Sequence, residues 1–249
     1  MDAIHGSGMN SWMLTLVTFV PAIGAAVLML FPRGAKIENH AQHDGHDDHP
    51  AFASDNTLKW IALIVSLLVF VFSLHLPAHW DYAHAGFQQQ FEVDKIWIGS
   101  PEIHYHLGVD GISMWLVILT TFLVPLSIIS SWNSIHGRVK EFMVLMLLQE
   151  TAMIGVFLAL DMFLFYLFWE MTLIPMALLI GIYGHGRRVY AAVKFFLYTM
   201  LASMFMLASL IWLYVKVGSL QYGVIQEWTL NWQNQFGPSF PQVATWLFL

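Results

Sequence analysis

"FLFYLFWEMTLIPMALLIGIYG", residues 163 to 184, decides the fold, because it is apolar from end to end except for the carboxylic acid Glu170. A run of this length crosses a hydrocarbon core of ~30 Å as a helix. In the whole chain 58% of the residues are hydrophobic and 10% are charged. Soluble domains have roughly 45–50% and 25%. The chain is therefore predicted to be an integral membrane protein. Its lack of cysteine excludes disulfides, iron–sulfur ligation and thiolate chemistry.

Apolar segments long enough to span a membrane recur along the chain. Six of them lie at residues 12–31, 58–76, 111–131, 141–160, 162–183 and 189–215. A seventh run, "FPQVATWLFL", occupies residues 240–249 and stays apolar to the last residue. This pattern predicts an all-α, polytopic bundle of transmembrane helices. We also expect the chain to be a fragment of a longer one.

The stretch from Val139 to Gly184 is 46 residues long, twice what one crossing needs, so a turn is expected near its middle. Asp161 is the charged residue placed to make it, and we predict a tight helical hairpin there, because backbone that turns at a membrane surface can be hydrated, whereas an unpaired turn facing lipid is costly. Basic residues gather in or beside loops on one side: Arg33, Lys36, Lys59, Arg138, Lys140, Arg187, Arg188 and Lys194. Only Lys95 and Lys216 lie opposite. The positive-inside rule therefore places the N-terminus outside, with Asp161 facing out.

The loop predicted to be cytoplasmic, residues 36–56, holds four histidines interspersed with Asp44, Asp47 and Asp48. Such a run can bind a divalent metal. The histidines are His40, His43, His46 and His49. Spacing of three residues without a fixed scaffold is a weak signal, so we predict no metal site and interpret the loop as a solvated linker.

The external loop, residues 77–110, contains two partly alternating runs on either side of Gly99, Ser100 and Pro101. This pattern predicts a short β-hairpin. An isolated two-stranded hairpin is marginal in water, so it needs a surface to lean on. It would serve either as a docking element for a neighbouring subunit or as a cap over the helix ends.

Glu150 and Glu170 lie 11 residues before Asp161 and 9 after it. At 1.5 Å per residue, they are ~16 and ~14 Å from the outer helix ends, near the bilayer midplane. A charged acid alone at that depth costs about 2.5 to 3.5 kcal/mol, so both should face the bundle interior or a hydrated cavity. Pro175 frees the carbonyl of Met171 beside Glu170, which gives water a foothold. We interpret the acids as proton carriers; the alternative is a structural hydrogen bond to a neighbouring helix.

Two further charges complete the candidate site. Lys194 lies six residues after Arg188. At ~9 Å along its helix it could snorkel to the cytoplasmic surface or reach inward to Glu170. As a partner, its ammonium would stabilise the carboxylate and couple the two protonation equilibria. Asp161 could act as an exit acid or as a helix N-cap.

Three stretches together resemble a known family: "HYHLGVDGISMWLVILTTF" (104–122), "QETAMIGVFLALDMFLFYLFWEMTLIPMALLIGIYG" (149–184) and "AVKFFLYTMLASMFML" (192–207). They look like the antiporter-like membrane subunits of NADH:quinone oxidoreductase, respiratory complex I. The segment "FWEMTLIPM" most resembles subunit M, the counterpart of mitochondrial subunit 4. Subunits L and N and the Mrp-type cation antiporters share the layout.

The resemblance implies a fourteen-helix subunit of roughly twice this length with inverted five-helix repeats. Residues 1–110 would supply two helices, the His-rich loop and the hairpin. Residues 111–249 would supply helices three to six, the start of the seventh, and the proton-channel part of the first repeat. Glu170 matches the family's essential glutamate, Glu150 a glutamate of the preceding helix, and Lys194 a lysine of the following helix. The family's other key lysine lies just past the end of this chain.

The implied function is proton translocation through Glu170, Glu150, Lys194 and Asp161. The chain would be a non-redox subunit of the enzyme, driven by electron transfer from NADH to quinone elsewhere in the complex. No cofactor is expected in it, since FMN, iron–sulfur clusters, NADH and quinone belong to other subunits. Subunits L and N are the expected neighbours, in a bacterial inner membrane with a periplasmic N-terminus, and no nucleic acid is expected. The alternatives are an Mrp-type cation/proton antiporter subunit and a non-pumping structural subunit.

Overall fold

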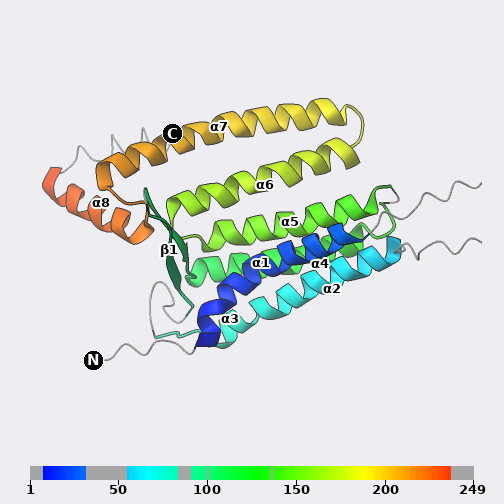
Figure 1. The fold of residues 1–249 in the computed structure, drawn as a ribbon, viewed down its shortest axis with the longest axis horizontal. Helices are drawn as coiled ribbons and strands as arrows, with labels where there is room; N and C mark the ends of the chain where they lie inside the picture. Colours follow the sequence, from blue (N-terminus) through cyan, green and yellow to red (C-terminus); the bar gives the residue numbers. More distant parts are fainter. Residues whose placement is uncertain (1–7, 32–54, 84–90, 100, 136, 237–249) are drawn as a thin grey trace, which may run out of the picture.

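A computed structural model describes residues 8–31, 55–83, 91–99, 101–135 and 137–236, with side chains from residue 12 to residue 231 (Figure 1). The His-rich loop and the seventh apolar run lie outside these residues. Six helices in the described part are long and apolar enough to cross a membrane, which confirms the predicted polytopic helical bundle. They are α1 (Gly8–Leu30), α2 (Asp55–Ser73), α4 (Gly111–Ser130), α5 (Val139–Leu158), α6 (Met162–Tyr183) and α7 (Arg188–Val217).

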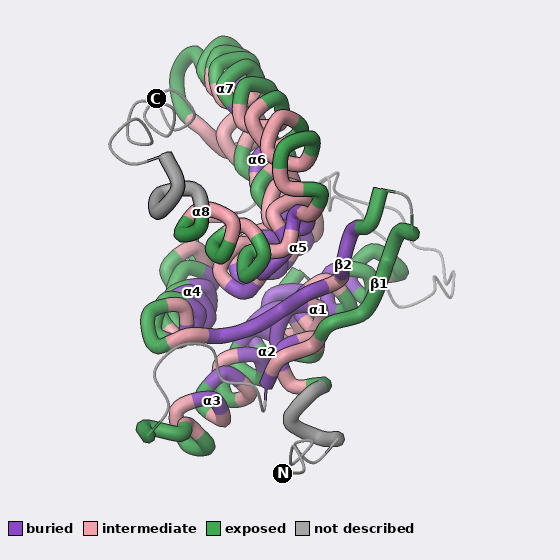
Figure 2. The backbone as a smooth tube through the Cα atoms, turned by 90° about the vertical axis from the view of Figure 1, so that its left-hand side faces the viewer, coloured by how far each residue is buried: buried purple, intermediate pink, exposed green. Residues whose placement is uncertain are grey.

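The helices run side by side, with α5 at the centre of the bundle (Figure 1). α5 packs against α1, α2, α4 and α6, whereas α7 lies on α6 at one side. As a result, 56% of the membrane-crossing stretch of α5 is buried but only 6% of that of α7 (Figure 2). A polar group on α5 is therefore shielded from lipid, whereas the open face of α7 is uncovered in this part of the chain.

The core of the bundle consists of two apolar clusters, one toward each end. The cluster at the end that carries the hairpin includes Ile154 and Leu158 of α5. The cluster at the opposite end includes Met143 and Leu147 of the same helix. Between Leu147 and Ile154, α5 carries its polar residues at mid-depth, and this is where the candidate site is found.

Basic side chains cap helix C-termini at the end of the bundle opposite the hairpin. A cation is favoured there because the last carbonyls of a helix lack intrahelical partners and carry partial negative charge. The contacts join Lys59 Nζ to Trp132 O at 2.6 Å, Lys140 Nζ to Met29 O at 2.7 Å, and Arg188 Nη1 to Ile182 O at 2.7 Å.

The predicted hairpin is present as antiparallel strands β1 (Val93–Gly99) and β2 (Glu102–Leu107). Figure 2 shows β2 crossing the end of the bundle, with the exposed β1 outside it. The Gly108 amide donates to Leu158 O and the Leu160 amide to His106 O, both at 2.9 Å. The hairpin therefore caps the α5–α6 turn, which is one of the two roles proposed for it.

The turn between α5 and α6 lies at residues 159–161, as predicted, and Asp161 is 0% exposed there. β2 covers it on one side and the chain after α7 covers it on the other, where the Met162 amide donates to Leu220 O and the Tyr222 amide to Leu160 O. These strand-like contacts satisfy the turn's backbone, so water is not needed there.

Two elements were not predicted: the single turn α3 (His75–Ala78) and α8 (Tyr222–Phe236). α3 is too short to show a periodic pattern. α8 contains too many polar residues to pass as a membrane span, and it follows α7 after Gly218, whose φ of 81° ends that helix in the left-handed conformation.

Candidate functional site

The structure places Glu150 and Glu170 at the same level of the bundle. Glu150 lies eight residues before Leu158, the end of α5, and Glu170 lies eight residues after Met162, the start of α6. Both acids are therefore ~12 Å inside the hairpin end of two neighbouring antiparallel helices. The matched depth expected from the spacing about Asp161 is present.

Glu150 is enclosed within the helices. It is 0% exposed, and neither of its carboxyl oxygens has a hydrogen-bond partner in the part of the chain that the structure describes. The hydroxyl of the next residue, Thr151, is also buried without a partner there. Buried polar groups are nearly always hydrogen-bonded, because leaving one unpaired costs about 1–3 kcal/mol. Two neighbouring exceptions at mid-membrane mark a site where function competes with stability.

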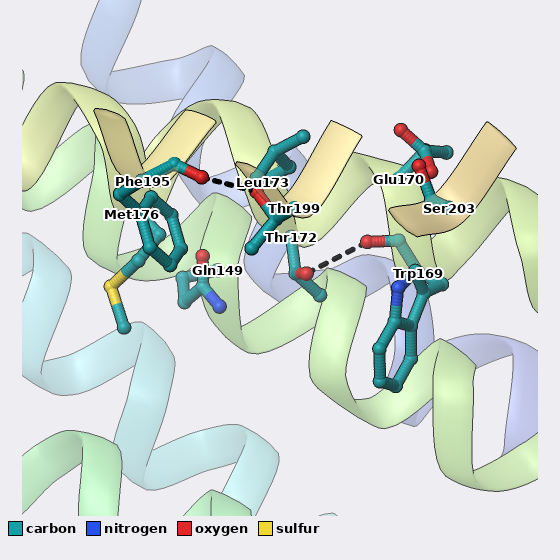
Figure 3. A pocket seen from close by; sticks show the side chains of 9 residues that line it. All are labelled: Gln149, Trp169, Glu170, Thr172, Leu173, Met176, Phe195, Thr199 and Ser203. Carbon is teal, nitrogen blue, oxygen red and sulfur yellow. Dashed lines mark hydrogen bonds between the residues drawn. The ribbon is translucent and has the colours of Figure 1, made fainter. Parts of the chain in front are cut away.

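Glu170 borders a cavity of about 190 Å³ between α5, α6 and α7 (Figure 3). Its polar lining comes from Gln149, Glu170, Thr172, Thr199 and Ser203, and four apolar side chains complete the wall. The Oε1 atom of Glu170 is buried and has no partner among the described residues. A polar cavity of this volume has room for several water molecules.

The hydroxyl groups around the cavity give it a particular polarity. Thr172 donates to Trp169 O at 2.7 Å and Thr199 to Phe195 O at 2.7 Å (Figure 3). Ser203 donates to Met200 O at 2.9 Å. Each hydroxyl hydrogen is thus used by the helix that carries it, and these three groups present oxygen lone pairs to the cavity. They can therefore accept hydrogen bonds from water or from a protonated acid, whereas the donors in the lining are the Gln149 amide and the Trp169 indole.

Gln149 and Glu150 lie on different sides of α5 although they are adjacent in sequence. Gln149 lines the cavity with its Oε1 atom unpaired among the described residues, whereas Glu150 lies in the interior. Successive residues of a helix point about 100° apart, which accounts for the divergence. α5 thus separates the two acids, with a polar side chain on each side of it.

A close approach of α5 and α6 fixes this arrangement. A Cβ atom at Gly155 would lie 2.2 Å from Cδ1 of Phe168, far inside van der Waals contact. Because Gly155 has no side chain, the ring of Phe168 packs directly on the backbone of α5. Phe168 is two residues from Glu170, so this contact helps to set how α6 presents its acid.

Asp161 has the geometry of the N-cap alternative. Its Oδ1 atom accepts the amides of Phe163 at 2.9 Å and Leu164 at 3.1 Å, and its Oδ2 atom accepts the amide of His104 at 3.1 Å. The bonds to Phe163 and Leu164 satisfy two of the amides at the start of α6 that have no partner within the helix, as expected of a helix N-cap.

Lys194 is exposed, and its Nζ atom lies 5.9 Å from the centroid of the Tyr190 ring. It does not line the Glu170 cavity, to which α7 contributes Phe195, Thr199 and Ser203. In this part of the chain Lys194 is thus exposed outside the cavity, near the end of α7 that begins at Arg188, a position from which its side chain can snorkel to the membrane surface.

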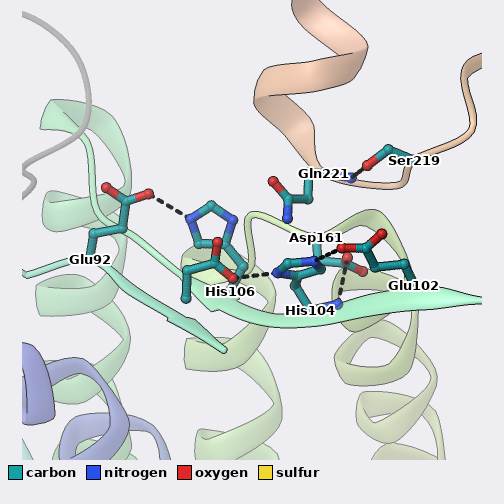
Figure 4. Close-up of polar contacts among 8 residues, drawn as sticks. Glu92, Glu102, His104, His106, Asp161, Ser219 and Gln221 are labelled. Atoms are coloured by element: carbon teal, nitrogen blue, oxygen red, sulfur yellow. Dashed lines mark hydrogen bonds and ion pairs between the residues drawn. The ribbon is translucent and has the colours of Figure 1, made fainter. Parts of the chain in front are cut away.

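Sequence reasoning missed a second polar cluster, on the hairpin (Figure 4). Nδ1 of His104 lies 2.6 Å from Oδ1 of Asp94, and its Nε2 lies 3.1 Å from Oε1 of Glu102. Nε2 of His106 lies 2.7 Å from Oε1 of Glu92. The signal was present, since His104 and His106 are two residues apart and so share one face of a strand.

The neighbouring carboxylates raise the pKa of the His104 imidazole. The hydrogen bond to Asp94 raises the pKa of its imidazole above 6.5, burial lowers it in part, and Glu102 raises it further. For metals, no group of three or more His, Cys, Asp or Glu within the described ranges is arranged to hold an ion.

Two family models match the chain. Residues 98–156 match "NADH-ubiquinone oxidoreductase chain 4, amino terminus", and residues 159–247 match "NADH:quinone oxidoreductase/Mrp antiporter, TM". The chain is 46% identical over 207 residues to NADH-quinone oxidoreductase subunit M of Rhodobacter capsulatus, covering 83% of this chain and 36% of the relative. It is 37% identical over 224 residues to NADH-ubiquinone oxidoreductase chain 4 of Mycosarcoma maydis, covering 90% and 42%.

Among solved structures, the fold is similar to a chain of respiratory complex I from Thermus thermophilus with bound NADH. The TM-score is 0.65 at 23% identity, over 85% of this chain and 38% of that one. At this identity the likeness concerns the fold. The chain spans less than half the length of the relatives described above.

Proposed function

Because the chain belongs to the family of membrane subunits shared by NADH:quinone oxidoreductase and the Mrp antiporters, we propose that it forms the first part of a proton-translocating subunit of complex I. Electron transfer from NADH to quinone elsewhere in the complex drives it, and this chain has no redox role of its own. FMN, iron–sulfur clusters and quinone belong to other subunits, and subunits L and N are its neighbours.

One observation carries the proposal: two carboxyl groups lie at the same depth on adjacent membrane helices, and both oxygens of Glu150 and Oε1 of Glu170 have no hydrogen-bond partner in the described part of the chain. An acid that only joins helices would be bonded to a neighbouring helix. An acid that binds and releases a proton needs access to water and an oxygen that no fixed donor occupies. Glu170 borders a polar cavity and its Oε1 is unpaired among the described residues, whereas its recorded side-chain partner, Tyr166, belongs to the same helix.

The chemistry at Glu170 follows from the lining of its cavity. A proton from the aqueous phase, relayed through water in the cavity, binds to Oε1 of Glu170, and the hydroxyl oxygens of Thr199 and Ser203 accept hydrogen bonds from that water. Glu150, at the same depth on α5 and with both carboxyl oxygens unpaired among the described residues, is the neighbouring acid of a stepwise relay.

Lys194 and Asp161 take supporting roles in this proposal. Lys194 tunes the charge of the site once the remainder of the subunit covers the open face of α7. Asp161 caps the start of α6 and lies at the hairpin end of the bundle, the end at which protons leave. We place the hairpin and the N-terminus in the periplasm of a bacterium, because Lys59, Lys140 and Arg188 cap helices at the opposite end.

A second candidate is a subunit of an Mrp-type cation/proton antiporter, because the family model that matches residues 159–247 names both kinds of protein. The helices and acids would be shared, and only the partners would differ. Proteins that co-purify with the full-length subunit distinguish the two, since complex I alone brings NADH-linked subunits.

The test replaces Glu170 by Gln in the full-length subunit. NADH-driven proton uptake and NADH:quinone turnover are measured in inverted membrane vesicles, with assembly of the complex verified. We expect both rates to fall at least about tenfold, since Gln keeps the volume and removes the titration. Glu227→Gln is the matched control, because Glu227 is exposed on α8, outside the bundle. Full activity of the Glu170→Gln variant in an assembled complex would overturn the proposal.

A further inference from the structure

The hairpin carries the imidazole of His104 between two carboxylates, and the number of N–H donors that these contacts require decides its protonation state. Both ring nitrogens of His104 face carboxylate oxygens, Asp94 on β1 and Glu102 on β2 (Figure 4). A neutral imidazole has one N–H, so one of the two contacts would set a lone pair against a carboxylate. An imidazolium has two, and it satisfies both contacts at once.

The same residue is attached to the start of α6. The backbone amide of His104 donates to Oδ2 of Asp161 at 3.1 Å, and Oδ1 of Asp161 caps the first turn of that helix. The side chain of His104 is 11% exposed, whereas those of Asp94 and Glu102 are 41% and 62% exposed. The imidazole is thus enclosed by the fold, and its two carboxylates open the cluster to the aqueous phase.

We propose that His104 is a proton-binding latch: a proton from the aqueous phase at the hairpin end joins Asp94 and Glu102 through one imidazolium and so holds the hairpin on the turn that starts α6. When the proton leaves, one carboxylate loses its donor. The imidazole then no longer joins Asp94 on β1 to Glu102 on β2, and the amide that bonds Asp161 is less firmly held. The pH at this end of the bundle therefore sets the rigidity of the helix that carries Glu170.

The other charges recorded around the hairpin are already engaged. Nε2 of His106 contacts Glu92, the residue before β1, and Nζ of Lys95 lies 4.6 Å from the ring centroid of Trp12 on α1. Asp161 from the α5–α6 turn adds negative charge near the backbone of His104. The net surroundings are anionic, which favours the imidazolium.

The direction of the pH dependence follows from the raised pKa of His104. A group whose pKa is higher in the folded state stabilises that state fully below its unfolded value of 6.5 and loses the contribution as pH rises through the folded value. The latch is therefore closed in mildly acidic solution and opens on the alkaline side of 6.5.

The test measures amide hydrogen exchange by mass spectrometry on the intact complex that contains the full-length subunit. Peptides covering residues 93–107 and 159–165 are followed from about one pH unit below 6.5 to about two above it, after correction for the intrinsic exchange rate. Protection of both peptides should fall together as pH rises. The fall approaches about tenfold for each pH unit that separates the folded and unfolded pKa values.

Matched variants make the result specific. His104→Gln should remove the pH-dependent step, whereas His106→Gln, which changes a histidine with one carboxylate contact and no recorded contact to Asp161, should retain it. If His104→Gln does not fold, Asp94→Asn supplies the test, because loss of one carboxylate should move the step to lower pH. A wild-type protein without the step, or a step that persists unmoved in His104→Gln or in Asp94→Asn, refutes the latch. Exchange at the hairpin is measured whether or not protons are transported, so this result stands apart from that of Glu170→Gln.

Discussion

Replacing Glu150 by Met should stabilise the protein while it impairs transport. Glu150 is 0% exposed and neither carboxyl oxygen has a partner among the described residues, so its burial costs about 1–3 kcal/mol that an apolar side chain would not. The change of shape costs less than about 1.5 kcal/mol at a well-packed position. The expected net effect is a gain of about 1 kcal/mol in the free energy of unfolding.

The assay is unfolding of the purified full-length subunit in mixed detergent micelles, followed by circular dichroism as the denaturing detergent is increased. Leu147→Met is the control, because Leu147 is also 0% exposed and lies one turn away on α5. It makes the same final side chain without removing a carboxyl group. Proton uptake in vesicles, measured on both variants, should fall only in Glu150→Met.

The comparison of Glu150→Met with Leu147→Met decides whether Glu150 is an unpaired proton carrier or a structural acid. If Glu150→Met is less stable than Leu147→Met, the carboxyl group is engaged in a structural hydrogen bond, and the reasoning that treats Glu150 as an unpaired proton carrier is wrong. A gain in stability together with full transport would show that the acid is unpaired but idle. Only a gain in stability with a loss of transport agrees with a site where function opposes stability.

Two other substitutions test the frame around the acids in the same unfolding assay. Gly155→Ala should lower the free energy of unfolding by about 1–3 kcal/mol, because its Cβ would lie 2.2 Å from the Phe168 ring. The Gly155→Ala/Phe168→Leu double variant should recover part of this loss of stability. If the losses of the two single variants simply add up in the double variant, the two residues are not in contact. Asp161→Ala should cost about 1–2 kcal/mol through loss of the cap on Phe163 and Leu164, whereas Asp161→Asn, which keeps that cap, should cost less and leave proton uptake intact. Uptake that collapses in a stable Asp161→Asn variant would show instead that Asp161 itself carries protons.

Much of the fold was predictable because a membrane span leaves a strong local signal. The apolar run around Glu170 has the length of a bilayer crossing. A search of the sequence for apolar runs of that length located all six described spans. The hairpin was predictable too, since Gly99 and Pro101 interrupt two alternating runs. Each of these signals is contained in about twenty neighbouring residues, which is why sequence sufficed.

The candidate site was only partly predictable. The depth of Glu150 and Glu170 follows from counting residues along a helix, and counting works because the rise per residue is constant. The direction of Lys194 could not be obtained in this way. Its rotation about the axis of α7 depends on which face packs against α6, and that face is chosen by side chains far away in sequence.

Sequence by itself determined that this protein crosses the membrane several times and carries two acids at mid-depth. The tertiary structure decided that Gln149 and Glu150 face different surroundings, that the turn at Asp161 is covered by β2, and that His104 lies between two carboxylates. The physical reason is that hydrophobic length is a property of one segment. Pairing, burial and the protonation state of a side chain depend instead on what other segments bring within hydrogen-bonding distance of it.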